Sequence, residues 1–462
     1  MRTRIVLAGR TLAVVLVSTA LFGACSGMPT TDGAPPLTDL SPAATAARAQ
    51  ALGASDVTVQ PATDGGFILG GKLDGDQFAL AFPASWNRDG LLFAHGYSTP
   101  GTPVAVAQDP VGKDVGGGAL KEAYAEGFAV GHSAYDKAGL GVQTGAENTL
   151  RLRNFLTDLG GKRTYVMGDS MGGGIVVTLL EMHPDAFAGG LARCGAVNSW
   201  ETLIDQLMDM RVVYNFLTEG TPYSLAGEKD VRKNAIAPEP PASVKAEAAQ
   251  AYVFGQMIKT ARPALDLWIT AQKNPDGREA HIIRIVTAIG GFEYDPASVA
   301  FPLLTVALGA EDMAATAGGW LYDNTSRVYS APGMTDAEIE ALNTGVQRVA
   351  AVPAARQYLR QWHTATGQLG APLITVHNSI DSLVPYSQEE ALARAVEAAG
   401  RQDRLLQFTV PAVRAPLPVY GIEGYTHCGF NKPETIAAWK FLRQWVETGA
   451  RPTTTTLGDG VR

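Results

Sequence analysis

Residues 168–172 read Gly-Asp-Ser-Met-Gly, and this is the most informative motif in the 462-residue chain. The apolar run 164–167 before it is typical of a buried strand, and 173–182 after it is typical of a helix. A Gly-x-Ser-x-Gly motif between a strand and a helix indicates a tight turn that raises a serine hydroxyl above the sheet. Ser170 is therefore a candidate nucleophile. The backbone N–H of Met171, at the start of the helix, is a candidate donor to an oxyanion.

Segments typical of strands and of helices alternate on both sides of this motif. The strand-like runs are residues 57–60, 77–82, 91–94, 128–131, 164–167, 190–196, 373–376 and 405–410. The first two of these runs are expected to form an opening hairpin. Such alternation predicts an α/β fold with a mostly parallel sheet and helices on both faces. Ligands bind at the carboxyl ends of the strands in such sheets, so polar residues directly after a strand are functional candidates.

The alternation stops in the middle of the chain, where the composition becomes helical. We expect one α/β domain in two parts, 55–198 and 371–450, split by a helical segment over 199–370. This segment is inserted between the sixth and seventh predicted strands. A separate middle domain is the alternative, but the return of the strand pattern afterwards favours an insertion. Residues 451–462 are expected to form a tail.

A serine nucleophile needs a base, and the base needs an orienting acid. With a nucleophile elbow the chain order is serine, acid, histidine. Asp381 lies just after the predicted strand 373–376, in an Asp-Ser-Leu-Val-Pro segment, and His427 lies in a Thr-His-Cys loop after the last predicted strand. Of the seven histidines only His427 has this order and setting. We therefore predict a Ser170–His427–Asp381 triad, although an Asp381 that only forms a turn and a His427 that only packs in its loop are the alternatives.

A second oxyanion donor is expected from the loop after an early strand of the sheet. That loop reads His95-Gly96-Tyr97 and directly follows the run 91–94. Gly96 allows the backbone to approach a substrate, and the Tyr97 N–H is the predicted donor. A simple glycine turn is the alternative interpretation.

Composition excludes several classes of function. The net charge is −8 and Lys and Arg do not cluster, so the basic surface that nucleic-acid binding needs is missing. The sequence has no His-Glu-x-x-His or paired Cys-x-x-Cys, and its glycine runs lack the Lys-Ser/Thr of a phosphate loop. We expect no metal, no cofactor and no nucleic-acid partner, and the oligomeric state is not indicated.

The N-terminus has the pattern of a secretion signal. Residues 1–10 carry three arginines, and the apolar stretch 11–22 is too short to span a membrane. It ends Leu-Phe-Gly-Ala-Cys, which resembles the lipobox of bacterial lipoproteins. We predict a signal peptide over 1–24, a lipid on Cys25 and a flexible, Pro/Thr/Ala/Gly-rich tether over 25–54. The protein is then an exported periplasmic or cell-surface lipoprotein that its lipid holds at a membrane, with an ordinary signal peptide as the alternative.

Together, the Gly-Asp-Ser-Met-Gly, His-Gly-Tyr, Asp-Ser-Leu-Val-Pro and Thr-His-Cys motifs resemble those of the α/β-hydrolase superfamily of serine hydrolases. The resemblance covers roughly residues 56–198 and 371–448. It implies an α/β-hydrolase fold with Ser170 as nucleophile, His427 as general base and acid, and Asp381 as its orienting carboxylate. It also implies that the inserted helices cap the active site. The motifs are specific for the superfamily but not for a substrate.

These motifs predict an exported serine hydrolase that cleaves small-molecule or polymeric carboxylic esters through an acyl-enzyme. A serine peptidase of the prolyl-oligopeptidase type is the alternative, but that group usually carries a large propeller, for which the segment 25–54 leaves no room. A non-catalytic binding lipoprotein is a third hypothesis, against which the four intact motifs argue. The aromatic residues of the insertion either line a substrate pocket or form the core of the insertion: Trp200, Tyr252, Phe254, Trp268, Phe292, Trp320 and Tyr322.

Two cysteines remain if Cys25 carries a lipid. Cys194 ends the strand after the nucleophile helix, and Cys428 directly follows His427, so both should lie at the rim of the site. Because an exported protein meets an oxidising environment, we predict a Cys194–Cys428 disulfide that fixes the His427 loop. Some tannase and feruloyl-esterase-like hydrolases similarly have a cysteine beside the catalytic histidine. They have a second one beside the nucleophile, where this chain has Asp169.

Overall fold

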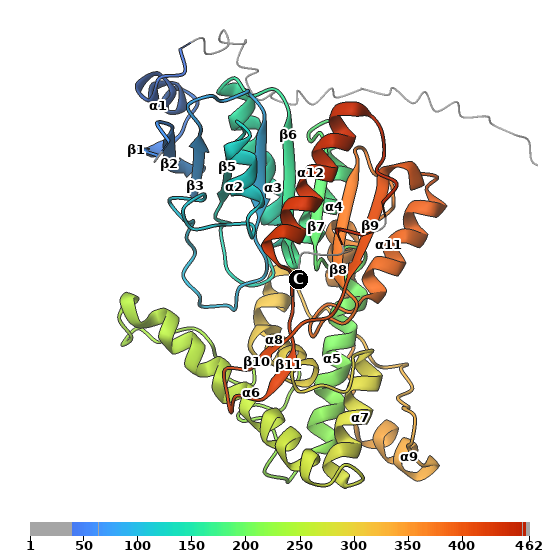
Figure 1. The fold of residues 1–462 in the computed structure, drawn as a ribbon. Helices are drawn as coiled ribbons and strands as arrows, with labels where there is room; N and C mark the ends of the chain where they lie inside the picture. Colours follow the sequence, from blue (N-terminus) through green and yellow to red (C-terminus); the bar gives the residue numbers. More distant parts are fainter. Residues whose placement is uncertain (1–38, 63, 455, 459–462) are drawn as a thin grey trace, which may run out of the picture. The chain divides into compact units, whose positions relative to one another are not determined.

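A nine-stranded sheet is the centre of the fold in the computed structural model, which describes residues 39–62, 64–454 and 456–458 (Figure 1). Its order is β1-β2-β3-β5-β4-β6-β7-β8-β9. The strands are β1 (Ser55–Pro61), β2 (Phe67–Leu73), β3 (Asp76–Phe82), β4 (Gly90–Ala94), β5 (Ala129–Ser133), β6 (Thr164–Asp169), β7 (Gly190–Arg193), β8 (Leu373–Asn378) and β9 (Leu405–Val410). The predicted signal peptide and Cys25 lie outside the described residues.

The strand pairing confirms the predicted fold class. Pairing is parallel from β5 through β4, β6, β7 and β8 to β9. The strands β1, β2 and β3 pair antiparallel, and β3 joins β5 antiparallel. Every residue of β4, β5, β7 and β8 is buried, as expected for parallel strands covered on both faces.

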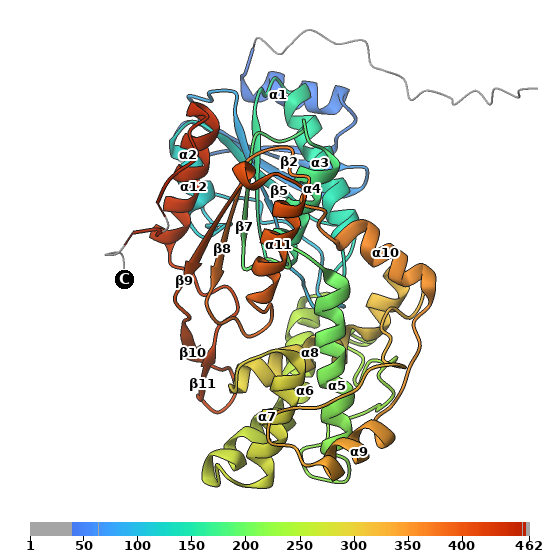
Figure 2. The ribbon, with the colours of Figure 1, turned by 90° about the vertical axis from the view of Figure 1, so that its right-hand side faces the viewer.

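Helices cover both faces of the sheet (Figure 2). One face carries α2 (Ala119–Ala125) and α12 (Lys432–Thr448). The other carries α3 (Val142–Asp158), α4 (Met171–Met182) and α11 (Ser387–Ala398). Each face therefore has its own apolar core, and the catalytic candidates Ser170 and Asp381 follow the carboxyl ends of β6 and β8.

The predicted opening hairpin is wrong because a strand was missed. Residues 57–60 and 77–82 do not pair with each other, since β2 lies between β1 and β3. The pair Gly70-Gly71 obscured β2 in the sequence, but glycine is needed here: a Cβ on Gly70 would lie 2.8 Å from Thr58 Oγ1. With this extra strand, the insertion lies between β7 and β8.

The inserted segment consists mainly of helices beyond the carboxyl end of the sheet (Figure 1). They are α5 (Trp200–Leu217), a short 3-10 helix (Ala246–Ala248), α6 (Ala249–Lys273), α7 (Arg278–Gly290), α8 (Pro296–Thr316), α9 (Asp336–Gly345) and α10 (Pro353–His363). Within the described residues, α8 is long and apolar enough to cross a membrane, by length and composition only. More than half of its most apolar stretch is buried inside the protein, so we interpret α8 as the central helix of the insertion.

The two ends of the insertion meet beside the sheet. The Ala365 N–H donates to the Asn198 carbonyl at 2.7 Å, and Ser199 and Thr364 form an isolated β-bridge. The Gln388 side-chain oxygen accepts from the N–H groups of Asn198 and Ser199, each at 3.0 Å. The insertion thus leaves and re-enters the α/β domain at one point.

The predicted flexible tether over residues 25–54 is wrong for its last part. Residues Pro42–Ala51 form helix α1, which begins with Ser41 as N-cap; the Ser41 hydroxyl accepts from the Ala44 N–H at 3.3 Å. Ala49 is fully buried in the core that also contains β2 and β3. The fold therefore begins before the first strand.

A second, small sheet precedes the predicted catalytic histidine. It consists of β10 (Arg414–Pro416) and β11 (Glu423–Tyr425), which pair antiparallel. The strand β11 packs against α8, and its Tyr425 N–H donates to the buried Asp295 carboxylate at 3.0 Å. This hairpin ties the chain before His427 to the insertion.

Candidate active site

Ser170 occupies a strained turn between β6 and α4. Its backbone has φ 57° and ψ −120°, a conformation that costs a non-glycine residue about 1–3 kcal/mol. The flanking glycines have no room for a side chain: a Cβ on Gly172 would lie 2.0 Å from the Ala94 oxygen, and one on Gly168 would lie 2.3 Å from the Gly172 oxygen. This is the geometry predicted from the motif. The turn is held by the Ser170 N–H, which donates to the Arg193 carbonyl at 3.0 Å.

The structure brings the three predicted triad residues together. Nε2 of His427 lies 2.8 Å from Ser170 Oγ, and Nδ1 lies 2.8 and 2.9 Å from the two carboxylate oxygens of Asp381. Because a carboxylate can only accept, Nδ1 carries the proton of the neutral ring. Nε2 then accepts the hydrogen bond from the Ser170 hydroxyl, as a general base must.

Asp381 is buried and well supplied with hydrogen bonds. It is 4% exposed, and its carboxylate accepts from the N–H groups of Leu383 and Val384, each at 2.9 Å, and of Cys428 at 3.2 Å. Burial opposes its ionisation, but the interaction with His427, together with smaller contributions from His377 and the Val384 N–H, outweighs burial and lowers the pKa of Asp381. The carboxylate therefore stays ionised beside the histidine.

The two predicted oxyanion donors belong to segments that adjoin Ser170. Met171 is the first residue of α4, so its N–H has no acceptor within the helix. The 95–97 loop passes close to the nucleophile, since a Cβ on Gly96 would lie 3.2 Å from Ser170 Cβ. This close approach explains the glycine and places the Tyr97 backbone next to the reacting oxygen.

The first residue of this loop, His95, is held in place by Tyr135. Its ring stacks on Tyr135 with the centroids 3.6 Å apart, and the Tyr135 hydroxyl donates to the His95 carbonyl at 3.1 Å. Burial lowers the pKa of His95, so the ring is neutral, and because a carbonyl can only accept, its Nδ1–H donates to the Gly96 carbonyl at 2.9 Å.

The predicted disulfide between Cys194 and Cys428 is present, with a Cα–Cα distance of 5.2 Å. It joins the end of β7, which holds the Ser170 turn, to the residue after His427. The sulfur atoms of both cysteines and a His427 nitrogen are close enough to bind a metal, but each sulfur is bonded to the other and both ring nitrogens have partners.

The sequence did not indicate that the residue before the nucleophile, Asp169, forms an ion pair. Arg193 makes two hydrogen bonds to Asp169, Nε to Oδ1 at 2.8 Å and Nη2 to Oδ2 at 2.6 Å. The Arg193 side chain is 5% exposed and also contacts Thr435 and the ring of Phe430. Asp169 thus occupies, with an ionic partner, the position where the resembling hydrolases have a cysteine. The signal was an acidic residue next to the nucleophile and an arginine before Cys194.

The His427 loop is also held by an amide that sequence reasoning missed. Asn378, the last residue of β8, accepts from the Gly429 N–H at 2.9 Å and donates to the Gly429 and Pro411 carbonyls at 3.0 Å each. Asn378 is fully buried. It therefore fixes the backbone on the far side of Cys428 independently of the disulfide.

A buried histidine underlies the turn that carries Asp381. His377 Nε2 lies 2.9 Å from the Val384 carbonyl, and Nδ1 lies 3.3 Å from the Glu389 carboxylate. Burial opposes a charge on His377, but the interaction with Glu389 raises its pKa above the usual value. Both ring nitrogens face acceptors, the Val384 carbonyl and the Glu389 carboxylate, so a protonated ring can donate to both and tie the turn to α11.

An apolar cavity of about 250 Å³ opens beside His427. Loops of the α/β domain and helices α6 and α8 of the insertion both contribute to its wall. The lining residues are Tyr97, Thr99, Met257, Phe301, Leu304, Thr305, Leu308, Leu383 and His427. None of the seven aromatic residues of the insertion that the sequence offered as pocket candidates is among them.

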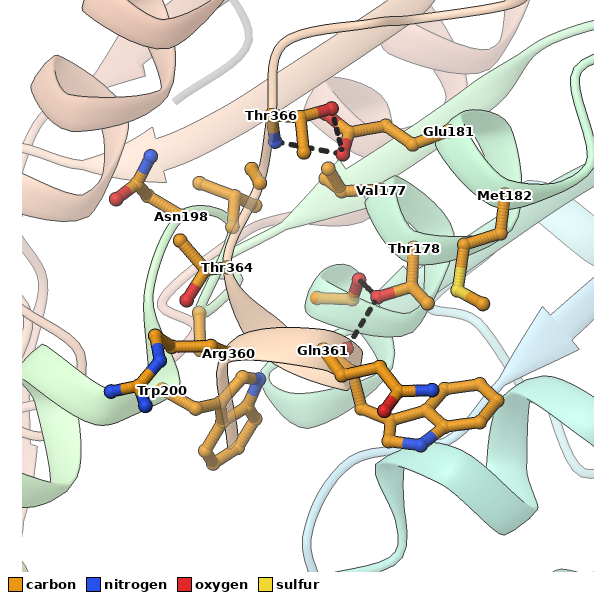
Figure 3. A pocket seen from close by; sticks show the side chains of 15 residues that line it. Val177, Thr178, Glu181, Met182, Asn198, Trp200, Arg360, Gln361, Thr364 and Thr366 are labelled. Atoms are coloured by element: carbon orange, nitrogen blue, oxygen red, sulfur yellow. Dashed lines mark hydrogen bonds between the residues drawn. The ribbon is translucent and has the colours of Figure 1, made fainter. Parts of the chain in front are cut away.

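A second cavity, of about 310 Å³, lies away from the triad (Figure 3). It is formed by α4, by residues 196–198 and the start of α5, and by the end of α10 with the chain that follows it. The Thr178 hydroxyl donates to the Trp362 carbonyl at 3.1 Å, and Glu181 accepts from the Thr366 N–H at 2.8 Å (Figure 3). Trp200 lines this cavity, but no triad residue does, so it is not the candidate active site.

Searches with the sequence found no matching family model and no curated relative. The fold is similar to that of feruloyl esterase B from Aspergillus oryzae, with 11% identity, a TM-score of 0.45, and coverage of 90% of this chain and 94% of the other. It is also similar to tannin acyl hydrolase from Aspergillus niger, with 15% identity, a TM-score of 0.41, and coverage of 86% and 84%. A dipeptidyl aminopeptidase IV from Bacteroides ovatus matches at 11% identity and a TM-score of 0.37, with coverage of 86% and 36%.

Identities this low carry no information about the substrate. The fold assignment rests on the strand order, on the serine in a left-handed turn between β6 and α4, and on the order of Ser170, Asp381 and His427 along the chain. The described residues of the chain therefore have the α/β-hydrolase fold.

Proposed function

We propose that the protein is an exported serine hydrolase that cleaves carboxylic esters with Ser170 as nucleophile. The observation that carries this proposal is the hydrogen-bond chain from Ser170 Oγ through His427 to the buried Asp381. A serine at a strained strand–helix turn, with a base within hydrogen-bond distance and an ionised orienting acid, is the arrangement that activates a hydroxyl for acyl transfer.

In the first half-reaction Ser170 Oγ attacks the ester carbonyl carbon while its proton passes to Nε2 of His427. The carbonyl oxygen becomes an oxyanion and accepts hydrogen bonds from the Met171 and Tyr97 N–H groups. The imidazolium that forms is stabilised by Asp381. Nε2 then returns the proton to the departing alkoxide oxygen, so the alcohol leaves and an ester of Ser170 remains.

In the second half-reaction a water molecule takes the place of the alcohol. His427 accepts a proton from the water as its oxygen attacks the acyl carbon, and the same N–H groups hold the oxyanion. When the intermediate collapses, the proton passes to Ser170 Oγ. The carboxylic acid leaves and the enzyme returns to its starting state.

The test is turnover of p-nitrophenyl esters and of aminoacyl p-nitroanilides by wild type, Ser170→Ala and a control, Ser387→Ala, in which an exposed serine of α11 is changed. We expect ester hydrolysis by wild type and control and none by Ser170→Ala. Activity that survives in Ser170→Ala would remove the nucleophile assignment. Hydrolysis of the anilides alone would favour the peptidase hypothesis. Absence of turnover and of fluorophosphonate labelling would favour a binding protein.

The proposal also covers the chain's location and organisation. Residues 1–24 direct export, Cys25 carries a lipid, and the insertion over 199–370 caps the site. In a bacterial host, wild type should label with a radioactive fatty acid and sediment with membranes. Cys25→Ser should do neither while it retains ester hydrolysis. Equal labelling of both proteins would refute the anchor.

A further inference from the structure

We infer that the cavity beside His427 is an apolar subsite that takes an uncharged, phenyl-sized group of the ester. The inference rests on the proposed ester hydrolysis and names a substrate class for it. The cavity borders His427 and Tyr97, the residues next to the reacting atoms, so a group held in it is directly joined to the scissile bond.

Two hydroxyl groups in the wall, those of Thr99 and Thr305, are bonded within the protein, and the third, that of Tyr97, is buried without a hydrogen-bond partner among the described residues. The Thr99 hydroxyl lies 3.8 Å from Met257 Sδ, and the Thr305 hydroxyl donates to the Phe301 carbonyl of its own helix at 2.9 Å. The Tyr97 hydroxyl is buried against α8. Apart from His427, the cavity therefore presents a hydrocarbon surface to its occupant.

The described residues in the wall of the cavity also include no Asp, Glu, Lys or Arg side chain. Of the nine lining residues, only His427 and Tyr97 titrate, and burial raises the pKa of Tyr97, so its phenol is neutral. A carboxylate or an ammonium group in the cavity would lose its water without gaining an opposite charge, which is strongly unfavourable. The subsite thus selects against acidic acyl groups and against the free amine of a peptide.

The volume limits the size of the occupant. The cavity measures about 250 Å³. A closed apolar cavity of about 150 Å³ binds benzene, so a phenyl ring fits here with space for a few more carbons. A benzoyl, phenyl or short branched alkyl group matches this volume.

A neighbouring cavity fits the substrate less well. It also touches His427, but otherwise it is lined by Val413 and by the loop that follows the histidine, Thr426 to Asn431, with Glu434. It contains neither Tyr97 nor any residue of the insertion, so it lies behind the loop and away from the oxyanion donors. The cavity under α6 and α8 is therefore the one that meets the reacting carbonyl.

Met257 is the residue for a test, because it is half-buried in the wall and outside the catalytic machinery. Met257→Trp fills the cavity and Met257→Ala enlarges it. Phe254→Trp is the matched control, since Phe254 lies one turn earlier on α6 and is 51% exposed. The substrates are methyl acetate, methyl benzoate and phenyl acetate, with methyl trihydroxybenzoate and monomethyl succinate, followed by pH-stat. The benzoyl and phenyl esters distinguish an acyl subsite from an alcohol subsite.

Wild type should prefer one of the two aromatic esters over methyl acetate. If methyl benzoate is the preferred ester, the cavity is an acyl subsite, and methyl benzoate should then exceed methyl trihydroxybenzoate by about 100-fold, as is typical when an apolar pocket meets added hydroxyls. Met257→Trp should lower kcat/KM for the preferred aromatic ester at least ~10-fold and that for methyl acetate far less. Met257→Ala should shift the preference to larger groups. Phe254→Trp should change neither value.

Equal losses on methyl acetate and on the aromatic ester in Met257→Trp would overturn the subsite. If methyl benzoate is the preferred ester, turnover of monomethyl succinate or methyl trihydroxybenzoate at the same rate would also overturn it. These outcomes leave the proposed ester hydrolysis intact, because wild type still cleaves esters. Absence of any ester hydrolysis would overturn both proposals.

Discussion

Replacing Gly309 with alanine should lower ester hydrolysis although Gly309 does not touch the triad. Gly309 lies on α8, and an added Cβ would lie 2.5 Å from the Tyr97 hydroxyl oxygen and 3.3 Å from the Met313 methyl. The methionine end can move aside, but the Tyr97 hydroxyl is buried at the end of a rigid ring. The change therefore pushes on the loop whose N–H is the proposed oxyanion donor.

The size of the effect follows from the overlap. Carbon and oxygen need about 3.5 Å, so the Tyr97 ring must move by roughly 1 Å. A displacement of that size at a catalytic group can lower the rate about 100-fold, close to the 10²–10³-fold cost of losing one oxyanion donor. Overpacking should also cost about 1–3 kcal/mol, less the ~0.5–1 kcal/mol that alanine gains over glycine in a helix.

The assay is kcat/KM for p-nitrophenyl acetate together with urea unfolding, on Gly309→Ala and two companions. Gly255→Ala is the control, because Gly255 lies in α6 with nothing within 4 Å of its added Cβ. It should keep full activity. The double variant Gly309→Ala/Tyr97→Phe removes the overlapping oxygen and should recover most of the lost activity. Full activity in Gly309→Ala, or a loss that Tyr97→Phe does not relieve, would refute the coupling between α8 and the oxyanion loop.

Three further predictions concern stability. Because the Cys194–Cys428 bond closes a loop of 234 residues, its reduction, or the double Ala variant, should lower the free energy of unfolding by up to about 5 kcal/mol. Reductant should not change the double variant. Asp169→Ala leaves Arg193 buried without its carboxylate and should cost about 3–5 kcal/mol, whereas Asp169→Leu/Arg193→Met should recover most of this in urea unfolding. The pKa of Asp381 is lowered, so its charge stabilises the fold above the unfolded value of about 3.9 and the effect is lost as the pH falls below it. The stability difference between wild type and Asp381→Asn should therefore shrink between pH 5 and more acidic conditions, as followed by denaturant midpoints, and a constant difference would contradict this.

The features whose positions in the fold agree with the sequence prediction are those encoded in short motifs. Ser170 was found because glycines flank it between a strand and a helix, and a turn without room for side chains demands that pattern. His427 and Asp381 were found from chain order and from their places after strands, which the topology of parallel sheets enforces. Buried parallel strands such as β4 and β8 are continuous apolar runs, so they also stand out.

The features that were missed depend on contacts between distant segments. The bond from Asn378 to Gly429 and the pair of Arg193 and Asp169 join residues from different strands and loops, and no local pattern marks either. Helix α1 did have a cap signal in Ser41-Pro42, but its Ala- and Thr-rich composition also suits a tether. The residues of α6 and α8 that face the cavity could not be chosen, because helical periodicity shows which faces are apolar and not what each face meets.

The meeting of the two insertion ends at Ser199 and Thr364 makes the helical segment exchangeable. A short loop across this bridge would reconnect β7 to β8, which pair directly from Gly190 and Leu373 onward. The elbow, the acid turn and the histidine loop lie outside the excised part, while Met257 and Phe301 lie inside it. Exchange of this one contiguous segment would therefore change the wall of the proposed subsite without changing the sequence around Ser170, Asp381 and His427.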